Sequence, residues 1–364
     1  MRILHIAPHY GGGIAPAVVG IIEATKASHM LVEIERTRDS VSLQLLSQLK
    51  IFPQSINSLR KGSAEIVQVD FVIFHFWNSN LWSKLASVES LCLTRGLVLL
   101  NHQAFAFNNE LANSVGNFFD ARLQSGFILD GLPEGWTLVP TCKNERRVES
   151  ETLIREHKAI YIGTLAYKKL SGDFFSIANQ FSDANIPVDI YGNLLDAVFT
   201  KDLEMLQNRN VKYKGYARDS TPIFAKATYF LYPLRANHYG TTENTLLEAM
   251  AQGVIPLVKR NPVESLILGV DLITFLDIDY CLPIQKCELF ENLEMRVEIS
   301  KRVRLRALEV MDVKFRESVW KSILNSTNRN LKRCSLSDLA SQIAQMAQQF
   351  PGPNPPKAEL DRYR

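Results

Sequence analysis

The chain has 364 residues, 46% hydrophobic and 22% charged, which is ordinary globular composition and enough for two domains of average size. A net charge of +3 is too weak to indicate a nucleic-acid-binding surface, and the five scattered cysteines favour reduced thiols over a disulfide framework. The sequence shows neither a signal peptide nor a run of about 18 apolar residues that could span a membrane. We therefore expect a cytoplasmic protein that makes at most peripheral contact with the inner face of a membrane.

In residues 1–145, short apolar segments alternate with amphipathic ones. The predicted strands are Arg2–Pro8, Met30–Arg36, Val69–Phe76 and Gly96–His102, followed by the short apolar runs 126–131 and 135–141. A helix is predicted at Ala15–Ser28. Fully apolar strands separated by helices are typical of a parallel sheet covered on both faces.

The charged segment Cys142–Lys158 carries no strand pattern, and the alternation restarts after it. Six more strands are predicted: Ala159–Thr164, Val188–Asn193, Val211–Tyr216, Thr228–Pro233, Val254–Val258 and Leu272–Asp277. We therefore expect an α/β protein with two doubly wound, Rossmann-like domains, 1–145 and 146–330, that face a central cleft. Ligands of such sheets bind outside the carboxyl ends of the strands.

The remaining chain is predicted to be helical and then disordered. The basic segment 291–324 is interpreted as a helix with a solvated face, and residues 335–350 as a final helix that could pack back on the first domain. The proline-rich tail 351–364 is predicted to be disordered.

Two features of the first half suggest a ligand site. The glycine loop Gly11–Gly13 follows the first strand and precedes a helix, so its backbone N–H groups can approach a ligand closely. Pro16 breaks the GxGxxG spacing, which disfavours NAD, and a tight turn without a ligand remains an alternative. His75 and His102 end two predicted strands at the rim of the cleft, although strand-end histidines often serve only as structural hydrogen-bonding groups.

In the second half, Gly163 follows a strand and the pair Lys168 and Lys169 comes shortly after it. A glycine turn followed by lysines suits a phosphate group. Surface lysines without a ligand are the alternative.

The segment "HYGTTENTLLEAMAQGVIPLV" (238–258) predicts a loop, a helix from about Thr242 to Gln252 and a buried strand. The helix N-terminus favours an anion, whereas Glu243 and Glu248 suit the hydroxyls of a ribose or hexose. Together these groups fit a nucleotide sugar. The structural alternative for Glu248 is a capping box with Thr245.

"ENTLLEAMAQGVIPLV" resembles the donor-site signature of retaining GT-B glycosyltransferases. "VDFVIFHFW", "LVLLNHQ", "IYIGTLAYKK" and "FRESVWKSIL" resemble further segments of that family. The resemblance implies GT-B architecture and transfer of a sugar from a UDP- or GDP-sugar to a saccharide, lipid-linked or other acceptor. It also implies retention, no metal ion, and a nucleotide sugar as co-substrate instead of a cofactor. By family frequency, the pathway would be bacterial surface polysaccharide or glycolipid synthesis.

The resemblance also assigns roles to individual residues. Glu248 would bind the donor ribose, Lys169 the diphosphate, and His102 the transferred sugar. Gly12 and Gly13 would lie beside the diphosphate and acceptor, with His75 and Trp77 on the acceptor side. The other residues predicted to bind the donor are Gly163, Thr164, Lys168, Tyr216, Arg235, Gly240, Thr241, Thr242, Asn244 and Thr245.

The sequence departs from the family pattern at two positions. Gly240 stands where the family keeps the first of its paired glutamates, so Glu243 or Asn244 is expected to replace that acid. We assign Glu243 to the catalytic set with His102 and Lys169. Thr164 stands where the family keeps an arginine, for which Lys168 or Arg235 would compensate. The "DID" at 277–279 matches a metal-binding DxD only at chance level.

Two other functions fit the same architecture. One is a sugar-nucleotide epimerase, which would need acid and base carboxylates in the cleft and no acceptor. The other is a non-catalytic homologue that binds a nucleotide sugar without turning it over.

Overall fold

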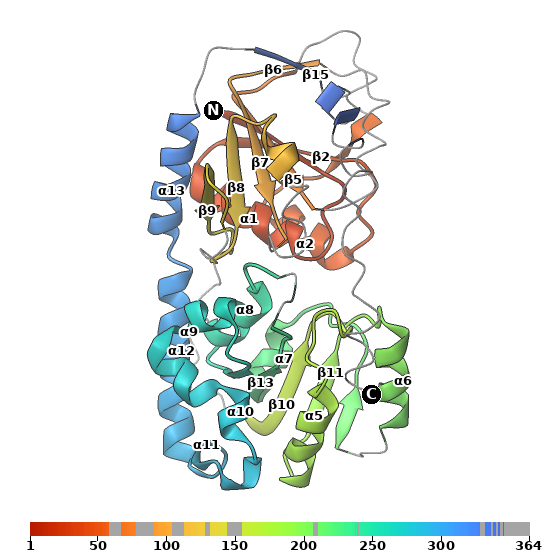
Figure 1. Cartoon of the computed structure of the whole chain (residues 1–364), viewed down its shortest axis with the longest axis vertical. Helices are drawn as coiled ribbons and strands as arrows, with labels where there is room; N and C mark the ends of the chain where they lie inside the picture. Colours follow the sequence, from red (N-terminus) through yellow and green to blue (C-terminus); the bar gives the residue numbers. More distant parts are fainter. Residues whose placement is uncertain are drawn as a thin grey trace. The chain divides into compact units, whose positions relative to one another are not determined.

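A computed structural model of the chain describes residues 1–57, 67–77, 91–103, 113–127, 132–143, 155–206, 210–236, 238, 240–327, 332–335, 338, 339, 341, 342 and 345 (Figure 1). The chain forms two compact units. Unit 1 combines Met1–Asn144 with the helix that begins at Val313, and unit 2 spans Glu145–Asp312.

Unit 1 contains a seven-stranded parallel sheet in the order β3-β2-β1-β5-β7-β8-β9. The strands are β1 (Arg2–Ala7), β2 (Ser28–Glu33), β3 (Gln54–Ser55), β5 (Phe71–Phe76), β7 (Gly96–Asn101), β8 (Ala121–Ser125) and β9 (Trp136–Val139). Helices α1 (Ile14–Thr25) and α2 (Ser40–Gln48) belong to this unit. A small separate sheet joins β15 (Lys332–Ser335), β6 (Leu91–Thr94) and β4 (Val67–Gln68). The strand order of the large sheet reverses between β1 and β5, as in dinucleotide-binding folds.

The apolar run 126–131 is not the strand that the sequence suggests. The strand of this region is β8, which ends at Ser125, and Gly126 and Phe127 form a bend after it, whereas 128–131 lie outside the described residues. Strand β8 has the sequence "ARLQS". Because polar residues interrupt it, it does not form the apolar run that predicts a buried strand.

Helix α13 (Val313–Ser326) packs on unit 1, so unit 2 ends at Asp312 and not at residue 330. Its Trp320 joins the buried core formed with Ile73 and Val98. Arg316 is fully buried and donates to the carbonyl oxygens of Gly20 and Cys142. The basic segment 291–324 was expected to present a solvated face, and this prediction is wrong at Arg316.

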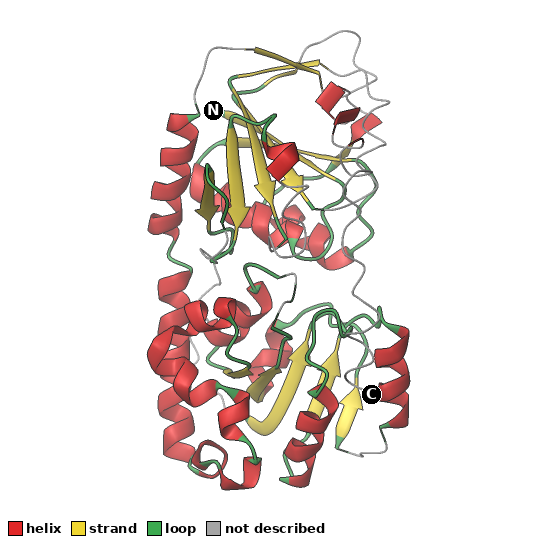
Figure 2. Ribbon diagram, viewed as in Figure 1, coloured by secondary structure: helices red, strands yellow, loops and turns green. Residues whose placement is uncertain are grey.

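Unit 2 contains a five-stranded parallel sheet in the order β12-β11-β10-β13-β14, with helices on both sides (Figure 2). The strands are β10 (Glu156–Ile162), β11 (Val188–Tyr191), β12 (Val211–Tyr213), β13 (Ala227–Tyr232) and β14 (Ile255–Val258). The helices are α5 (Phe174–Asp183), α6 (Ala197–Met205), α7 (Thr221–Lys226), α8 (Asn244–Ala251), α9 (Pro262–Leu276), α10 (Ile278–Cys281), α11 (Glu288–Glu291) and α12 (Leu293–Val310), with a short 3-10 turn at Ile284–Lys286.

The strand predicted at Leu272–Asp277 is wrong, because these residues lie at the end of α9. Only Asp277 forms a bridge to the sheet, with Val258. Helix α9 is kinked at Gly269, whose φ of 78° is left-handed, and it buries Leu272, Ile273 and Leu276. A short apolar run that is buried cannot be assigned to a helix or a strand by periodicity alone.

Of the helix predicted at 335–350, only five residues are described as helical, and Leu339 among them packs against the core of unit 1. Ser335 instead ends strand β15. The tail 351–364 lies outside the described residues.

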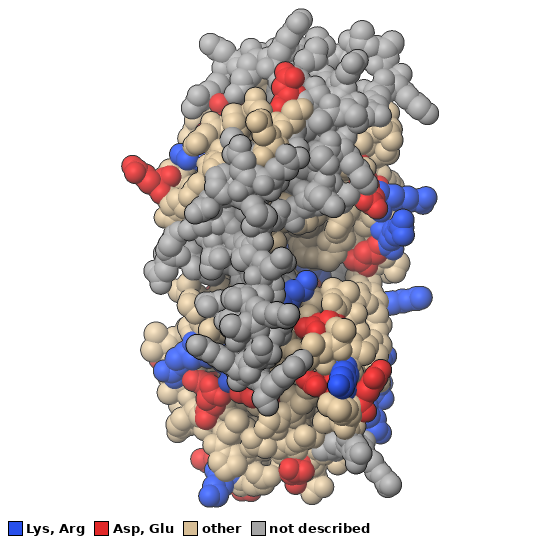
Figure 3. All heavy atoms as spheres, turned by 45° about the vertical axis from the view of Figure 1, so that its right-hand side comes forward, with Lys and Arg blue, Asp and Glu red and all other residues tan. Residues whose placement is uncertain are grey.

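Basic and acidic side chains are interspersed over the face drawn in Figure 3. Within the described residues, no helix is both long and apolar enough to cross a bilayer.

Candidate functional site

The loops after β10 and β13 of unit 2 lie together at the carboxyl edge of the sheet. These two strands are neighbours, and they flank the point where the strand order reverses, which is where open parallel sheets bind ligands. A bridge between Leu170 and Leu234 ties the loops, and the Arg235 N–H donates to the carbonyl oxygen of Lys169 at 3.0 Å. The predicted residues Gly163, Thr164, Lys168, Lys169, Arg235, Gly240 and Glu243 belong to these two loops.

Glu243 lies at the centre of a buried polar cluster and is only 5% exposed. The Lys169 ammonium donates to its carboxylate at 3.1 Å, and the Tyr232 hydroxyl donates to the same oxygen. Burial raises the pKa of Glu243, but the nearby Lys169 and His238 and these hydrogen bonds outweigh that effect and hold the pKa below its ordinary value. Glu243 is therefore an ionised, oriented carboxylate at neutral pH.

His238 lies between two buried carboxylates. Its Nδ1 is 3.5 Å from Glu243, and its Nε2 is 3.1 Å from the fully buried Glu264. The Gly240 N–H donates to Nδ1 at 3.1 Å, so Nδ1 acts as an acceptor and Nε2 is the nitrogen that faces Glu264. We call Lys169, Tyr232, His238, Glu243 and Glu264 the acid cluster.

The Glu243 carboxylate occupies the space where a side chain at position 240 would begin. A Cβ added at Gly240 would lie 1.6 Å from Oε1 of Glu243. Glu243 has a left-handed backbone with φ of 45°, and it immediately precedes α8. Glu243 is therefore the acid whose carboxylate fills the space beside position 240.

Helix α8 begins at Asn244, two residues later than predicted, with Glu243 at its N-cap and no capping hydrogen bond from that side chain. Thr245 is therefore inside the helix, and the capping-box alternative for Glu248 is wrong, because the box requires Thr245 at the N-cap. The half-buried Glu248 instead accepts a hydrogen bond from the Ser220 hydroxyl at 3.2 Å.

The other predicted donor residues have varied surroundings. At Gly163, a Cβ would lie 2.6 Å from the Tyr161 hydroxyl, which donates to the carbonyl oxygen of Thr164. The Arg235 guanidinium donates to the carbonyl oxygen of Tyr167 at 3.4 Å. Thr241 and Thr242 are buried, Asn244 and Thr245 are half-buried, and Lys168 and Tyr216 are exposed.

In unit 1, the predicted glycine loop lies at the N-terminus of α1. Gly12 has a left-handed φ of 61°, and its N–H donates to the Asp39 carboxylate at 3.1 Å. Added Cβ atoms at Gly12 and Gly13 would meet nothing within 4 Å, so the loop is open at these positions. Trp77 packs edge-on against His9, and His75 is fully buried with its Nδ1 2.9 Å from Nε2 of His102.

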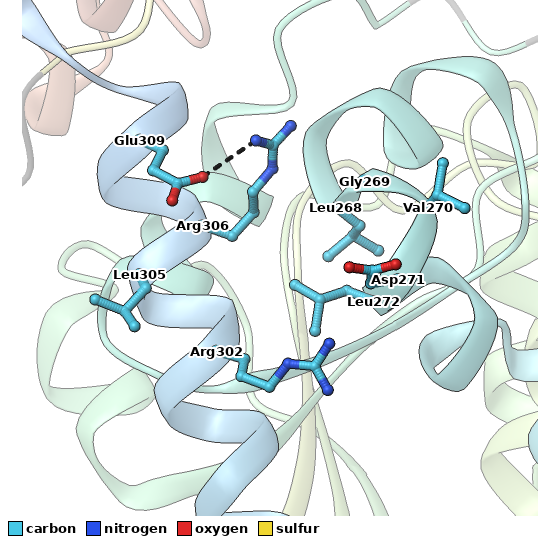
Figure 4. Close-up of a pocket in the computed structure, with 9 residues that line it drawn as sticks. All are labelled: Leu268, Gly269, Val270, Asp271, Leu272, Arg302, Leu305, Arg306 and Glu309. Carbon is cyan, nitrogen blue, oxygen red and sulfur yellow. Dashed lines mark hydrogen bonds and ion pairs between the residues drawn. The ribbon is translucent and has the colours of Figure 1, made fainter.

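A surface pocket of about 360 Å³ lies between α9 and α12, and none of the predicted site residues lines it (Figure 4). Gly269 and Arg306 are among its lining residues, and Arg306 forms an ion pair with Glu309 at 3.3 Å. Across the described part of the chain, no three His, Cys, Asp or Glu residues gather as a group that could hold a metal ion.

No protein-family model matches the chain, and comparison with curated proteins gives no match. Solved structures do resemble it. HepE from Anabaena, in complex with UDP-glucose, is similar over 90% of this chain and 100% of its own, with 13% identity and a TM-score of 0.67. A glycosyltransferase from Rickettsia africae covers 90% of this chain and 99% of its own, with 10% identity and a TM-score of 0.60. The pneumococcal O-GlcNAc transferase GtfA, in complex with UDP and GlcNAc, covers 75% and 58%, with 14% identity and a TM-score of 0.51.

The chain therefore has the GT-B glycosyltransferase fold, with two Rossmann-like domains, and the predicted fold class is confirmed.

Three members of the acid cluster were not among the residues predicted from the sequence: Tyr232, His238 and Glu264. His238 had a signal, since it lies in the same polar loop as Gly240 and Glu243. Tyr232 and Glu264 had none, because one ends an apolar strand and the other lies in the first turn of an apolar helix.

Proposed function

We propose that the chain is a glycosyltransferase that moves a sugar from a UDP- or GDP-sugar to a saccharide, lipid-linked or other acceptor, with retention and without a metal ion. The observation that carries this proposal is the position of Glu243. An ionised carboxylate, held by Lys169 and Tyr232 at the switch point of the second sheet, fills the space next to Gly240. That is the position where the resembling family keeps a glutamate for the donor.

Each residue of the site has a chemical role under this proposal. Glu243 accepts hydrogen bonds from hydroxyls of the transferred sugar, and Glu248 accepts them from the ribose. The Lys169 ammonium, which pairs with Glu243 at the carboxyl edge of the sheet, also stabilises charge on the departing diphosphate. The N-terminus of α8 adds a partial positive charge near the same group. The leaving phosphate then serves as the base for the acceptor hydroxyl.

Similar proteins support a uridine nucleotide as the first donor to test. HepE has been solved with UDP and with UDP-glucose, and GtfA with UDP and GlcNAc. The ligands of these structures support the class of donor, and because the identity is only 13–14%, the sugar, the acceptor and the pathway are left for assay. Surface polysaccharide or glycolipid synthesis, by an enzyme bound peripherally at the membrane, remains the pathway that we propose to examine first.

Exchanging the two residues tests the role of Glu243. The double variant Gly240→Glu with Glu243→Gly moves the acid to the position that the family uses, and glycine tolerates the left-handed backbone at 243. We expect Glu243→Gly alone to lower UDP release from UDP-glucose by about a hundredfold, as for loss of one transition-state contact. The double variant should recover at least a tenth of the wild-type rate.

The single variant Gly240→Glu is the matched control, because it adds an acid and displaces Glu243 without removing it. Full activity of Glu243→Gly in a folded protein would contradict the assignment. Appearance of a C2 epimer of the donor by NMR would instead establish the epimerase. Thermal stabilisation by UDP without any turnover would establish a non-catalytic binding protein.

A further inference from the structure

Four histidines of unit 1 form a continuous hydrogen-bonded row, which we call the histidine ladder: His29, His5, His75 and His102. The nitrogens that join His29 to His5, His5 to His75, and His75 to His102 are each 2.9 Å apart. The first three lie in the neighbouring strands β2, β1 and β5, and His102 directly follows β7.

The register of the sheet explains the ladder. His29 pairs with Ile3, two residues before His5, and His5 pairs with Ile73, two residues before His75. His75 pairs in turn with Leu100, two residues before His102. Each step therefore crosses one strand and advances two residues, which keeps all four side chains on one face of the sheet. The ladder ends at the carboxyl edge, where ligands of such sheets bind.

All four rings are neutral at neutral pH. His5 and His75 are fully buried, and burial lowers the pKa of both well below the ordinary value. Burial also lowers the pKa of His29 to about 4 and that of His102 to about 3. A neutral imidazole has one N–H and one acceptor nitrogen, so a row of such rings must donate in one direction throughout.

Thr25 fixes that direction. Its hydroxyl donates to the carbonyl oxygen of Ile21 at 2.7 Å, which uses its single proton. Nε2 of His29 lies 3.1 Å from the same hydroxyl oxygen and must therefore donate to it. His29 then accepts at Nδ1 from His5, His5 accepts at Nδ1 from His75, and His75 accepts at Nδ1 from His102.

From this geometry we infer that the ladder is a positioning device that holds His102 with its proton on Nε2 and with Nδ1 as a hydrogen-bond acceptor. Thr25, His29, His5 and His75 act through His102 as positioning residues. A ligand that meets Nδ1 must then bring a donor, which selects a hydroxyl, such as that of a sugar, and rejects a phosphate oxygen. The link to a sugar hydroxyl rests on the proposed function, whereas the tautomer does not.

NMR of the full chain with ¹⁵N-labelled histidine tests the tautomer. We expect the ¹⁵N shifts of all four ladder rings at pH 7 to report a proton on Nε2 and none on Nδ1. A proton on Nδ1 of His102, or a charged His102 ring, would overturn the inference.

A matched pair at Thr25 tests the anchor. Thr25→Val removes the hydroxyl at nearly constant shape, and we expect the His102 nitrogens to shift towards a mixture of tautomers. Thr25→Ser keeps the hydroxyl and should leave the wild-type shifts unchanged. Identical His102 shifts in both variants would show that Thr25 does not set the direction.

Ligand titration separates this inference from the proposed function. Addition of UDP-glucose should move the Nδ1 signal of His102, and UDP alone should not. If the unliganded tautomers are as expected and neither ligand moves the signal, the proposed contact with the sugar fails while the ladder stands.

Discussion

The acid cluster of unit 2 and the histidine ladder of unit 1 bury polar groups in opposite ways. In the ladder, each ring is neutral, and His29, His5 and His75 each donate one hydrogen bond and accept one. In the acid cluster, Glu243 stays charged because Lys169 and Tyr232 surround it. The neutral histidine ladder fixes the ring nitrogens that carry protons. The pairing of Glu243 with Lys169 instead fixes the position of a carboxylate anion. The two clusters should therefore differ in their response to pH and to removal of one member.

Acidification should give the largest difference between the two regions. A ladder histidine whose folded pKa lies below the unfolded value near 6.5 binds more protons when unfolded, so its stability contribution falls as pH drops below about 6.5. The loss continues to the folded values, about 4 for His29 and about 3 for His102. Each buried ladder histidine can lose up to about 1.4 kcal/mol per pH unit in that window.

The acid cluster should respond only at lower pH. The pKa of folded Glu243 lies below its ordinary value of 4.5, so its contribution is complete above 4.5 and is lost below it. Hydrogen-exchange protection, corrected for the intrinsic exchange rate at each pH, should therefore fall between pH 7 and 5 in peptides from β1 and β5 and stay nearly constant in peptides from β13 and α8. An equal loss of protection in both regions would contradict the expected difference.

Removing one member of the acid cluster should give the next largest effect. Lys169→Met leaves the buried carboxylate of Glu243 without its cation, which we expect to cost about 3 kcal/mol of unfolding free energy. Adding Glu243→Gln should recover most of this loss, because the uncompensated charge is then gone. Urea unfolding measures both changes.

Lys168→Met is the matched control for that experiment. Lys168 is the adjacent, exposed lysine, and its loss should change stability by less than about 0.5 kcal/mol. A similar loss from both lysine variants would indicate a general charge effect instead of a specific pair.

The smallest expected effect concerns the start of α8, the helix that follows the acid cluster. Thr245→Ala should change stability by less than about 0.5 kcal/mol, since Thr245 lies inside the helix and caps nothing. Asp196→Ala in the same unit is the comparison, because Asp196 accepts hydrogen bonds from Val198 and Phe199 as the N-cap of α6. We expect that variant to lose about 1 kcal/mol. If Thr245→Ala lost more unfolding free energy than Asp196→Ala, the capping box of Thr245 and Glu248 would be supported after all.

Local patterns were sufficient for most of the fold, and they marked the loops in which we propose the site. Apolar strands separated by helices predicted two parallel sheets, and the segment around Glu243 and Glu248 predicted a ligand-binding loop and helix. The pattern failed at Leu272–Leu276, where a buried helix end and a strand look alike. It also failed for β8, whose polar residues do not form an apolar run.

The sequence by itself determined the fold class, because the alternation of apolar segments and the glycine turns are local properties of the chain. It also showed that Gly240 departs from the resembling family. Only the tertiary structure decided which acid fills that space, since the answer depends on the left-handed backbone of Glu243.

The histidine ladder likewise depends on tertiary structure. Its neighbouring members are 24, 70 and 27 residues apart in sequence, and only the strand order and register bring them together. The same holds for α13, whose helical pattern is local but whose packing on unit 1 is set by the partners of Trp320 and Arg316. Contacts between distant segments leave no periodic signal in a single sequence, and this is the physical reason that they had to be seen in the folded chain.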